Sequence, residues 1–409
     1  MELSSKDRLE VQRVLDLALG IGAAQLACGV GAVDVTASML GVLEAYGVRR
    51  CQVDVTYDRI LVSYRAWVGA DPLTAMHRVR SRSLDYGRLQ AVDSLVQRVT
   101  AGSVDRSEAN AELDQIVRAP HRYPRWVATA ALAAVGAGMA VLLGGGVVVA
   151  CAAAGTTAAI DRLGRVLNRH GVLLFFQQIV GAAVATAVTV LLTAVDLVAG
   201  TNPSLVAAAN IVVLLSGMAV VGAVQDTLTG YYLTGVARGV EIAVFSIGLL
   251  VGVTIALKVA LVVGVDVAIA PDIVAPALLS LPVRVVAGGV VAAAVALAGY
   301  APLRGLVAAG IAGGTGSAVF LLLSYADFGL VASSFVAATL IGMAGAIMSR
   351  RFRLPPLIVA MAGIIPLVPG LTTYRGFVSL ITGDAVGGLT SLSAALATAL
   401  ALGAGVLCG

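Results

Sequence analysis

Long apolar runs separated by short polar loops fill the last two-thirds of the chain. A helix needs about 20 mostly apolar residues to cross a bilayer. On that measure the pattern predicts ten membrane spans, at residues 126–143, 145–160, 172–195, 203–224, 240–263, 283–300, 305–324, 328–349, 355–374 and 385–407. The expected fold class is therefore mainly α, in a polytopic membrane protein.

Composition divides the chain into two parts. Of its 409 residues, 59% are hydrophobic and only 12% are charged, whereas about 25% of the residues of a soluble protein are charged. Residues 1–125 hold 16 Lys and Arg and 15 Asp and Glu, while residues 126–409 hold only 11 and 8. We therefore expect a water-soluble head at residues 1–125, followed by a membrane body.

The head has the pattern of a small α+β domain. Helical and alternating spacing of apolar residues predict helices at about 7–28, 34–46, 86–100 and 106–117, and a strand pair at 51–57 and 60–67. Asp34 is the expected N-cap of the second helix. The apolar run Val14–Val33 leaves a membrane span open as an alternative. The basic run His77–Arg82 is expected to be solvated or to meet anionic lipid headgroups.

Charge and cysteine usage argue against several classes of protein. The net charge of +4 comes mostly from arginines that flank apolar segments, and aromatic residues make up 5% of the chain, so no nucleic-acid partner is expected. Four cysteines lie far apart without a CxxC pattern, at Cys28, Cys51, Cys151 and Cys408, and suggest neither disulfides nor a metal site. No hydrolase or phosphate-loop motif is present. We expect no enzyme activity and no cofactor.

Loop charges predict how the spans are oriented. The first residues are charged and no signal peptide follows them, so the head is expected to stay in the cytoplasm. The inner loops then carry Arg162, Arg165, Arg169, Arg238, Arg304, Arg350, Arg351 and Arg353, and the outer loops carry Asp196, Asp266, Asp272 and Asp327. Because short cytoplasmic loops are rich in Lys and Arg, we expect a multi-pass protein of the cell membrane with both termini cytoplasmic.

The membrane body contains an internal repeat. Leu215-Ser216-Gly217 and Val368-Pro369-Gly370 each precede a Thr-Gly pair, Thr229-Gly230 and Thr382-Gly383, at an offset of 153 residues. Five spans per half would place the second half upside down relative to the first. We therefore expect a 5+5 inverted repeat, with halves at residues 126–264 and 265–409. Interrupted spans at corresponding positions of such halves indicate the binding site of a secondary transporter.

The interrupted segment 363–376 supplies most of the candidate substrate ligands. Its two prolines each remove an amide donor and favour a break. A break near Gly370 would leave a helix N-terminus suited to a carboxylate. The candidates are Pro369, Gly370, Thr372, Thr373, Tyr374 and Arg375. The alternative is a simple proline kink that leaves Arg375 at the outer headgroups.

A second candidate segment follows the fourth predicted span. Ionisable groups near membrane depth are functional candidates, and Asp226 could bind a substrate ammonium or carry a proton. Thr227 and Thr229 could orient its carboxylate. The alternative is an interfacial loop in which Asp226 forms an ion pair with Arg238, a residue that could also act as a gate.

Four further residues complete the candidates. Gly217 marks the interruption in the first half and could contact substrate. Glu241 is a second candidate for proton coupling. Lys258 either snorkels to the outer headgroups or acts as a gating or ion-pair partner. Asn210 is expected to form an interhelical hydrogen bond rather than to bind a ligand.

Several motifs together resemble those of the threonine/serine exporter family. They are Gly31-Ala32-Val33-Asp34-Val35-Thr36, Glu44-Ala45-Tyr46-Gly47, Val53-Asp54-Val55-Thr56, Val224-Gln225-Asp226-Thr227-Leu228-Thr229-Gly230, Gly235-Val236-Ala237-Arg238 and Gly363-Ile364-Ile365-Pro366-Leu367-Val368-Pro369-Gly370. Where the family resemblance leads us to expect Pro-Gly in the first half, this chain has Ser216-Gly217. The fourth span is therefore expected to be less sharply broken than the ninth.

The resemblance implies a ten-helix exporter with a cytoplasmic head. The implied activity is export of threonine, serine or similar small amino acids, driven by the proton motive force, in an amino-acid/proton antiporter. Its partners would be the amino acid, protons and the lipid bilayer, and a homo-oligomer is compatible with the pattern. The alternatives are a dicarboxylate exporter of succinate-like substrates, a membrane-anchored enzyme or sensor acting through the head, and a passive channel.

Overall fold

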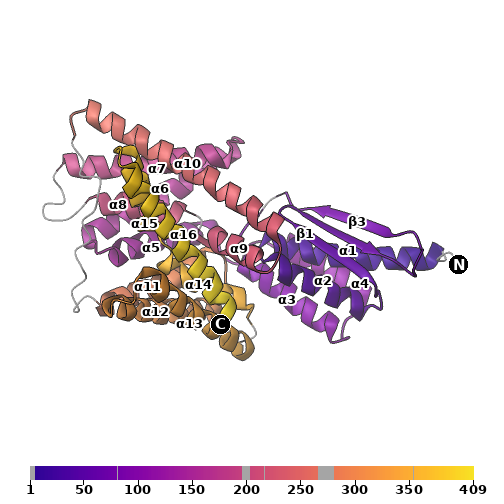
Figure 1. Cartoon of the computed structure of the whole chain (residues 1–409). Coiled ribbons are helices and arrows are strands. Elements are labelled where there is room, and N and C mark those ends of the chain that lie inside the picture. The colour runs from indigo at the N-terminus through magenta and orange to yellow at the C-terminus, as the bar shows by residue number, and fades with distance from the viewer. Residues whose placement is uncertain (1–4, 81, 196–202, 216, 266–280, 353) are drawn as a thin grey trace. The chain divides into compact units, whose positions relative to one another are not determined.

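The computed structural model describes residues 5–80, 82–195, 203–215, 217–265, 281–352 and 354–409. The chain forms two compact units, drawn together in Figure 1. The head unit comprises Met1–Arg122, Gln225–Arg238 and Gly299–Ala301. The membrane unit comprises Tyr123–Val224, Gly239–Ala298 and Pro302–Gly409. The head unit thus includes two short stretches that come from the helical body of the chain.

The head unit is an α+β domain. Its elements are α1 (Ser5–Ala27), α2 (Ala32–Ala45), β1 (Cys51–Thr56), β2 (Arg59–Tyr64), β3 (Leu73–Arg78), α3 (Tyr86–Thr100) and α4 (Arg106–Arg118). The strands form an antiparallel sheet in the order β1-β2-β3. Large apolar side chains from helices and sheet fill its core, including Leu15, Ile21, Met39, Leu43, Ile60 and Leu95. The four predicted helices and the predicted strand pair are confirmed.

Three details of the head differ from the sequence-based expectation. α2 begins at Ala32 with Gly31 as N-cap, so the prediction of Asp34 as N-cap is wrong. β3 was not predicted, because its pairing with β2 stabilises a strand that local alternation does not indicate. The alternative of a span over residues 14–33 is not supported, because α1 ends at Ala27 and packs against α2, α3, α4 and the sheet.

The membrane unit consists of helices. They are α5 (Arg125–Leu142), α6 (Val147–Arg169), α7 (Leu174–Ala194), α8 (Ser204–Leu214), α9 (Gly217–Leu228), α10 (Tyr232–Val262), α11 (Leu281–Ala298), α12 (Leu303–Tyr325), α13 (Leu330–Phe352), α14 (Pro356–Ile364), η2 (Ile365–Leu367), α15 (Gly370–Ile381) and α16 (Ala385–Cys408). α9 and α10 each begin or end within the head unit. The helical fold class is confirmed.

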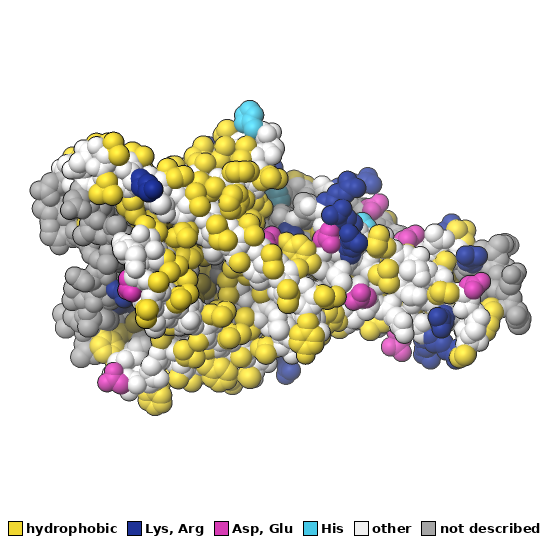
Figure 2. Space-filling model, turned by 45° about the horizontal axis from the view of Figure 1, so that its top comes forward, with side chains coloured by type: hydrophobic (Ala, Val, Ile, Leu, Met, Phe, Trp, Pro, Cys, Tyr) yellow, Lys and Arg dark blue, Asp and Glu magenta, His cyan; other side chains and the backbone are white. Residues whose placement is uncertain are grey.

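Helices long and apolar enough to cross a membrane dominate this unit. Within the described residues, eight single helices qualify, or ten spans if each of two bent helix pairs counts as one. Figure 2 shows apolar side chains over much of the visible face of the membrane unit, and exposed examples include Ile247, Leu261, Val286, Val307 and Leu340. The ninth span was predicted too short, because helix continues beyond residue 374 to Ile381.

The two halves of this unit repeat in the bounds of their helices. α5, α6 and α7 begin at Arg125, Val147 and Leu174, and α11, α12 and α13 begin 156 residues later, at Leu281, Leu303 and Leu330. α9 spans Gly217–Leu228, and α15 spans Gly370–Ile381, 153 residues later at both ends. In each half the fourth span is the interrupted one. The repeated motif seen in the sequence is therefore accompanied by a repeated order of helices.

Small residues bring the helices of each half close together. Gly252 of α10 faces the backbone carbonyl of Ile179 in α7, and Gly405 of α16 faces that of Phe335 in α13. These glycines are also 153 residues apart in sequence. An added Cβ at either position would lie within 3.0 Å of a neighbouring helix. The fifth helix of each half thus packs on the third in a similar way, as expected for small-residue contacts in membranes.

Candidate transport site

The ninth span is broken at its prolines. α14 and η2 run to Leu367, Val368 adopts an extended conformation, and α15 starts at Gly370 with Pro369 as N-cap. The two helical parts are inclined by 46°. Because proline has no N–H and disfavours helix at the residue before it, Pro366 and Pro369 account for the break. The predicted interruption is confirmed.

The fourth span is broken at the corresponding place. α8 ends at Leu214, Leu215 is extended with ψ 109°, and α9 begins at Gly217. The inclination between α8 and the part of α9 from Ala219 onward is 44°. Ser216 lies outside the described residues. The expectation of a weaker break in this half is wrong, since the two bends are nearly equal.

The two broken spans meet each other within the membrane unit. A Cβ added to Gly370 would lie 2.8 Å from the Cβ of Val212 in α8, so only glycine permits this approach. Farther along α15, Tyr374 and Val378 are buried in one cluster with Ala207, Ala208 and Ile211 of α8. The start of α15 is therefore fixed against the last turn of α8.

The polar residues at the start of α15 differ in what they can offer a ligand. The Thr373 hydroxyl donates to the carbonyl of Pro369 at 2.8 Å, and Tyr374 is buried in the apolar cluster. Thr372 is half-buried, and its hydroxyl makes no hydrogen bond to any described residue. Arg375 is also half-buried and takes part in a polar interaction. The first amides of a helix lack intrahelical acceptors and attract anions. Thr372 lies beside these amides, so its hydroxyl is the one best placed to bind a ligand held there.

Asp226 is held within the head unit. It lies in the last turn of α9 rather than in a loop, and its side chain is 1% exposed. Its Oδ1 accepts a hydrogen bond from the backbone N–H of Ala32 at 3.0 Å. Its Oδ2 lies 3.1 Å from Nη1 of Arg238, which is 4% exposed. The ion pair considered from the sequence is therefore present.

The contact with Ala32 explains how α2 begins. Its N-cap, Gly31, has no side chain to satisfy the first amides of the helix. Asp226 supplies that acceptor from 194 residues away along the chain. Asp34 lies in the same first turn, where desolvation of its carboxyl group and then the charge of Asp226 raise its pKa. The sequence signal for this contact is Gly31, a residue without a capping side chain directly before an apolar helix.

The hydroxyl of Thr229 does not orient the carboxylate of Asp226 as expected. The Thr229 hydroxyl donates to the backbone carbonyls of Gln225 and Asp226, at 2.8 and 3.2 Å. Thr227 is exposed and takes part in a polar interaction. Thr229 therefore stabilises the end of α9, which is followed by Gly230 at φ +91°. In the second half, Thr382 and Gly383, also at φ +91°, end α15 in the same way.

The remaining candidates lie on α10 and α8. Glu241 is half-buried and Lys258 is exposed, both on α10. Asn210 of α8 is fully buried, and its Oδ1 accepts a hydrogen bond from Thr157 of α6 at 2.7 Å. The expected interhelical bond of Asn210 is confirmed. Among the described residues no group of three or more His, Cys, Asp or Glu could hold a metal ion.

A multi-pass helical protein with a broken span in each of two repeating halves has the architecture of a secondary transporter. Comparison with known proteins makes the assignment specific. A family model described as "Putative threonine/serine exporter" matches residues 16–260, and one described as "Threonine/Serine exporter, ThrE" matches residues 284–409. The chain belongs to the threonine/serine exporter family. This is a family of transporters, so the alternative of a membrane-anchored enzyme is not supported.

Two relatives cover nearly the whole chain. One, from Mycobacterium tuberculosis (strain ATCC 25618 / H37Rv), is named "Probable threonine/serine exporter" and is 42% identical over 409 residues, 98% of this chain and 77% of its own length. The other, from Corynebacterium glutamicum, is named "Threonine/serine exporter" and is 35% identical over 406 residues, 98% of this chain and 83% of its own length. No solved structure matches the chain.

Proposed function

We propose that the protein exports threonine and serine across the cell membrane by alternating access, in exchange for protons. Its halves, residues 126–264 and 265–409, would lie in opposite orientations, and the head at residues 1–125 would be cytoplasmic with both termini. The matching starts of α5–α7 and α11–α13 and the matching bounds of α9 and α15 support this arrangement. With the site between them, a rocking motion would open it to each side of the membrane in turn.

The meeting of α8 with the start of α15 is the observation that carries the proposal. Val212 and Gly370 hold the two breaks against each other. Broken backbone within a membrane is tolerated only where protein or water surrounds it. The same breaks provide helix termini that can bind the charged groups of an amino acid. A plain membrane anchor would gain nothing from this arrangement.

We assign the substrate carboxylate to the start of α15. Pro369 and Gly370 form the break, Thr372 and Thr373 supply hydroxyls, and Arg375 supplies a cation. The partial positive charge of a helix N-terminus favours an anion by about 0.3–1 kcal/mol at an exposed site and up to about 2 when partly buried. An arginine adds a charge-assisted hydrogen bond. Tyr374 and Gly217 complete the proposed lining of the site.

We assign proton coupling to the cytoplasmic end of α9 and α10. Asp226 and Glu241 are the proposed proton carriers there, with Arg238 as ion-pair partner and gate. Lys258, near the other end of α10, is proposed as a further gating or ion-pair residue. A role of Asp226, Thr227 and Thr229 as substrate ligands is a further proposal. The closed contacts of Asp226 with Ala32 and Arg238 favour its acting as a gate over its meeting substrate directly.

Efflux from proteoliposomes tests the proposal. Vesicles containing the full chain are loaded with radiolabelled threonine, serine or succinate, and efflux is followed with and without an imposed pH gradient. We expect the gradient to drive threonine and serine uphill and to leave succinate inside. Succinate efflux alone would favour the dicarboxylate alternative, and efflux that only ever runs downhill would favour a channel.

A further inference from the structure

Two stretches from the helical body belong to the head unit, one from each half. Residues 225–238 connect α9 to α10 in the first half, and residues 299–301 connect α11 to α12 in the second. Both connections are inner loops in the topology predicted from loop charges. We call their contacts with the head the Asp226 joint and the Tyr300 joint.

The Asp226 joint is buried and bonded at three places. Asp226 accepts from the N–H of Ala32 and pairs with Arg238. The Tyr231 hydroxyl donates to the Thr36 hydroxyl at 2.9 Å. The Thr234 hydroxyl donates to the carbonyl of Val55 at the end of β1, at 3.2 Å. Helix α2 and the sheet are thus both bonded to the first half.

The Tyr300 joint rests on backbone and ring contacts. The backbone N–H of Tyr86 donates to the carbonyl of Gly299 at 2.7 Å. A Cβ on Gly299 would lie 2.6 Å from the Tyr86 ring, so that ring lies directly on the glycine. The ring of His121 stacks on Tyr300, with centroids 4.4 Å apart and planes 11° apart.

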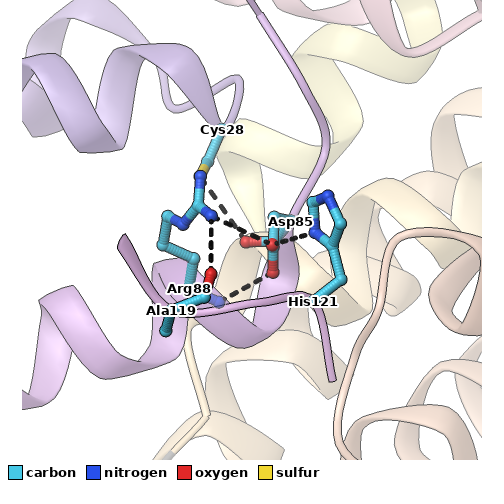
Figure 3. A network of polar contacts seen from close by, with 5 residues as sticks. All are labelled: Cys28, Asp85, Arg88, Ala119 and His121. Carbon is cyan, nitrogen blue, oxygen red and sulfur yellow. Dashed lines mark hydrogen bonds and ion pairs between the residues drawn. The ribbon is translucent and has the colours of Figure 1, made fainter. Parts of the chain in front are cut away.

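A polar network in the head holds His121 against Tyr300. Nδ1 of His121 lies 2.8 Å from Oδ2 of Asp85, and the other oxygen of Asp85 accepts from the backbone N–H of Arg88 at 2.9 Å. Figure 3 shows His121 and Arg88 both directed at this carboxylate. The Cys28 thiol, whose pKa burial raises to about 11, donates to the Asp85 carbonyl. The ring of His121 is therefore positioned by the head, and Tyr300 is its partner from the second half.

The two joints should differ in how readily they open. Opening the Asp226 joint gives up three hydrogen bonds to the head, at Ala32, Thr36 and Val55, and the bond from Ala32 is stronger than one between neutral groups because a carboxylate accepts it. Opening the Tyr300 joint gives up a ring stack and a backbone hydrogen bond, each worth about tenfold or less in an equilibrium constant, together with the contact of the Tyr86 ring with Gly299. Tyr300 also has φ +60°, a conformation that is unfavourable for tyrosine. The second-half joint is the weaker one.

We infer that the head is a strap between the two halves of the exporter, fixed to the first half at Asp226 and released from the second half at Tyr300 during each transport cycle. The inference rests on the proposed alternating access, because halves that rock must change the distance between these two loops. His121 and Tyr300 then form a contact that opens and closes during transport, far in sequence from the proposed substrate ligands, and neither side chain is needed for transport by itself.

Reversible cross-linking of the weaker joint tests the inference. In a background with alanine at Cys28, Cys51, Cys151 and Cys408, the pair H121C and Y300C is joined in reconstituted full-length protein by a short bis-methanethiosulfonate. We expect threonine efflux to fall by about tenfold or more, as when a gating motion is blocked, and to return on reduction. Equilibrium threonine binding should change by less than about threefold, because a lock on motion need not alter the occupied site.

Matched controls separate the strap from general damage. The pair S63C and T74C lies within the head, on neighbouring positions of β2 and β3, and its cross-link should leave efflux unchanged. Each single-cysteine variant should also export after treatment. Full efflux by the cross-linked H121C and Y300C protein would overturn the strap while leaving the exporter proposal intact. Absence of efflux from both the cysteine-free protein and the wild type would overturn the strap and the exporter proposal together.

Discussion

The helices α9 and α15, which follow the two breaks, have similar backbone features but carry their polar residues at opposite ends. Both have the same length. Each is followed by a threonine whose hydroxyl donates to a backbone carbonyl of the last turn, and then by a glycine at φ +91°. In α15 the polar run Thr372–Arg375 comes at the start, beside the break. In α9 the polar run Gln225–Thr227 comes at the end, in the head unit.

This difference shows which part of the structure the repeat determines. The position that corresponds to Asp226 in the second half is Ser379, and the position that corresponds to Arg375 in the first half is Gly222. The break recurs because it depends on backbone and packing, whereas the side chains have diverged. We therefore place substrate recognition at α15 and attachment of the head at α9, and the following substitutions test that division.

The largest effect should come from Asp226→Asn. Asparagine can still accept from Ala32, but it leaves the buried Arg238 without its carboxylate partner, which typically costs about 3–5 kcal/mol. We expect a marked fall in the melting temperature of the full chain in detergent, accompanied by loss of efflux. Ser379→Ala, at the corresponding position of α15, should change neither. Loss of efflux at an unchanged melting temperature would show that Asp226 acts as the proposed proton carrier and that its ion pair with Arg238 adds little to stability.

A smaller effect is expected from Gly370→Ala. The added methyl would meet Val212, and overpacking of this kind usually costs about 1–3 kcal/mol. We expect threonine efflux to fall by roughly tenfold as α15 is displaced from α8. The double variant with Val212→Ala should recover part of the rate. Gly155→Ala on α6, where nothing lies within 4 Å of an added Cβ, should export normally; equal losses in both variants would contradict the role of this contact.

Thr372→Val should reduce apparent affinity more than Thr373→Val. The Thr373 hydroxyl already donates to Pro369, while the Thr372 hydroxyl makes no hydrogen bond to any residue that the structure describes. A hydrogen bond to substrate is worth about 1 kcal/mol, or roughly fivefold in the half-saturating threonine concentration. The change for Thr373→Val should stay below about twofold. The reverse order would move the substrate hydroxyl contact to Thr373.

Sequence patterns predicted the membrane part of the fold well because its signals are local. Apolar runs of span length and the prolines at Pro366 and Pro369 act within a few residues of where they occur. The end of α15 at Ile381 was not predicted, because the polar run Thr372–Arg375 gives no local sign that the helix continues beyond it. The polar run lies at the start of α15, directly after the break.

The contacts of Asp226 and Tyr300 could not be predicted in the same way. Asp226 contacts Ala32, 194 positions away, and Tyr300 contacts His121, 179 positions away. No local sequence pattern encodes such pairings. Gly31 gave the only usable hint, since a helix start without a capping side chain needs an acceptor from elsewhere. The same long-range pairing explains why β3 was not predicted and why Asp34 was wrongly given the N-cap.

The smallest effect should come from Asp34→Asn, which tests whether the charge of Asp34 opposes that of Asp226 at the Asp226 joint. A carboxyl group whose pKa is raised in the folded state binds its proton more readily there than in the unfolded chain, so the folded state gains stability as pH falls through that range. At neutral pH the ionised Asp34 opposes Asp226, and asparagine should raise the melting temperature slightly. Because Asp34 is exposed, the gain should stay below about 1 kcal/mol. It should disappear below about pH 3, where aspartate is mostly protonated in both states. Asp54→Asn, on the exposed face of β1, serves as control. A gain that persists at low pH would show that asparagine acts through packing, and the charge of Asp34 would then have no part in the joint.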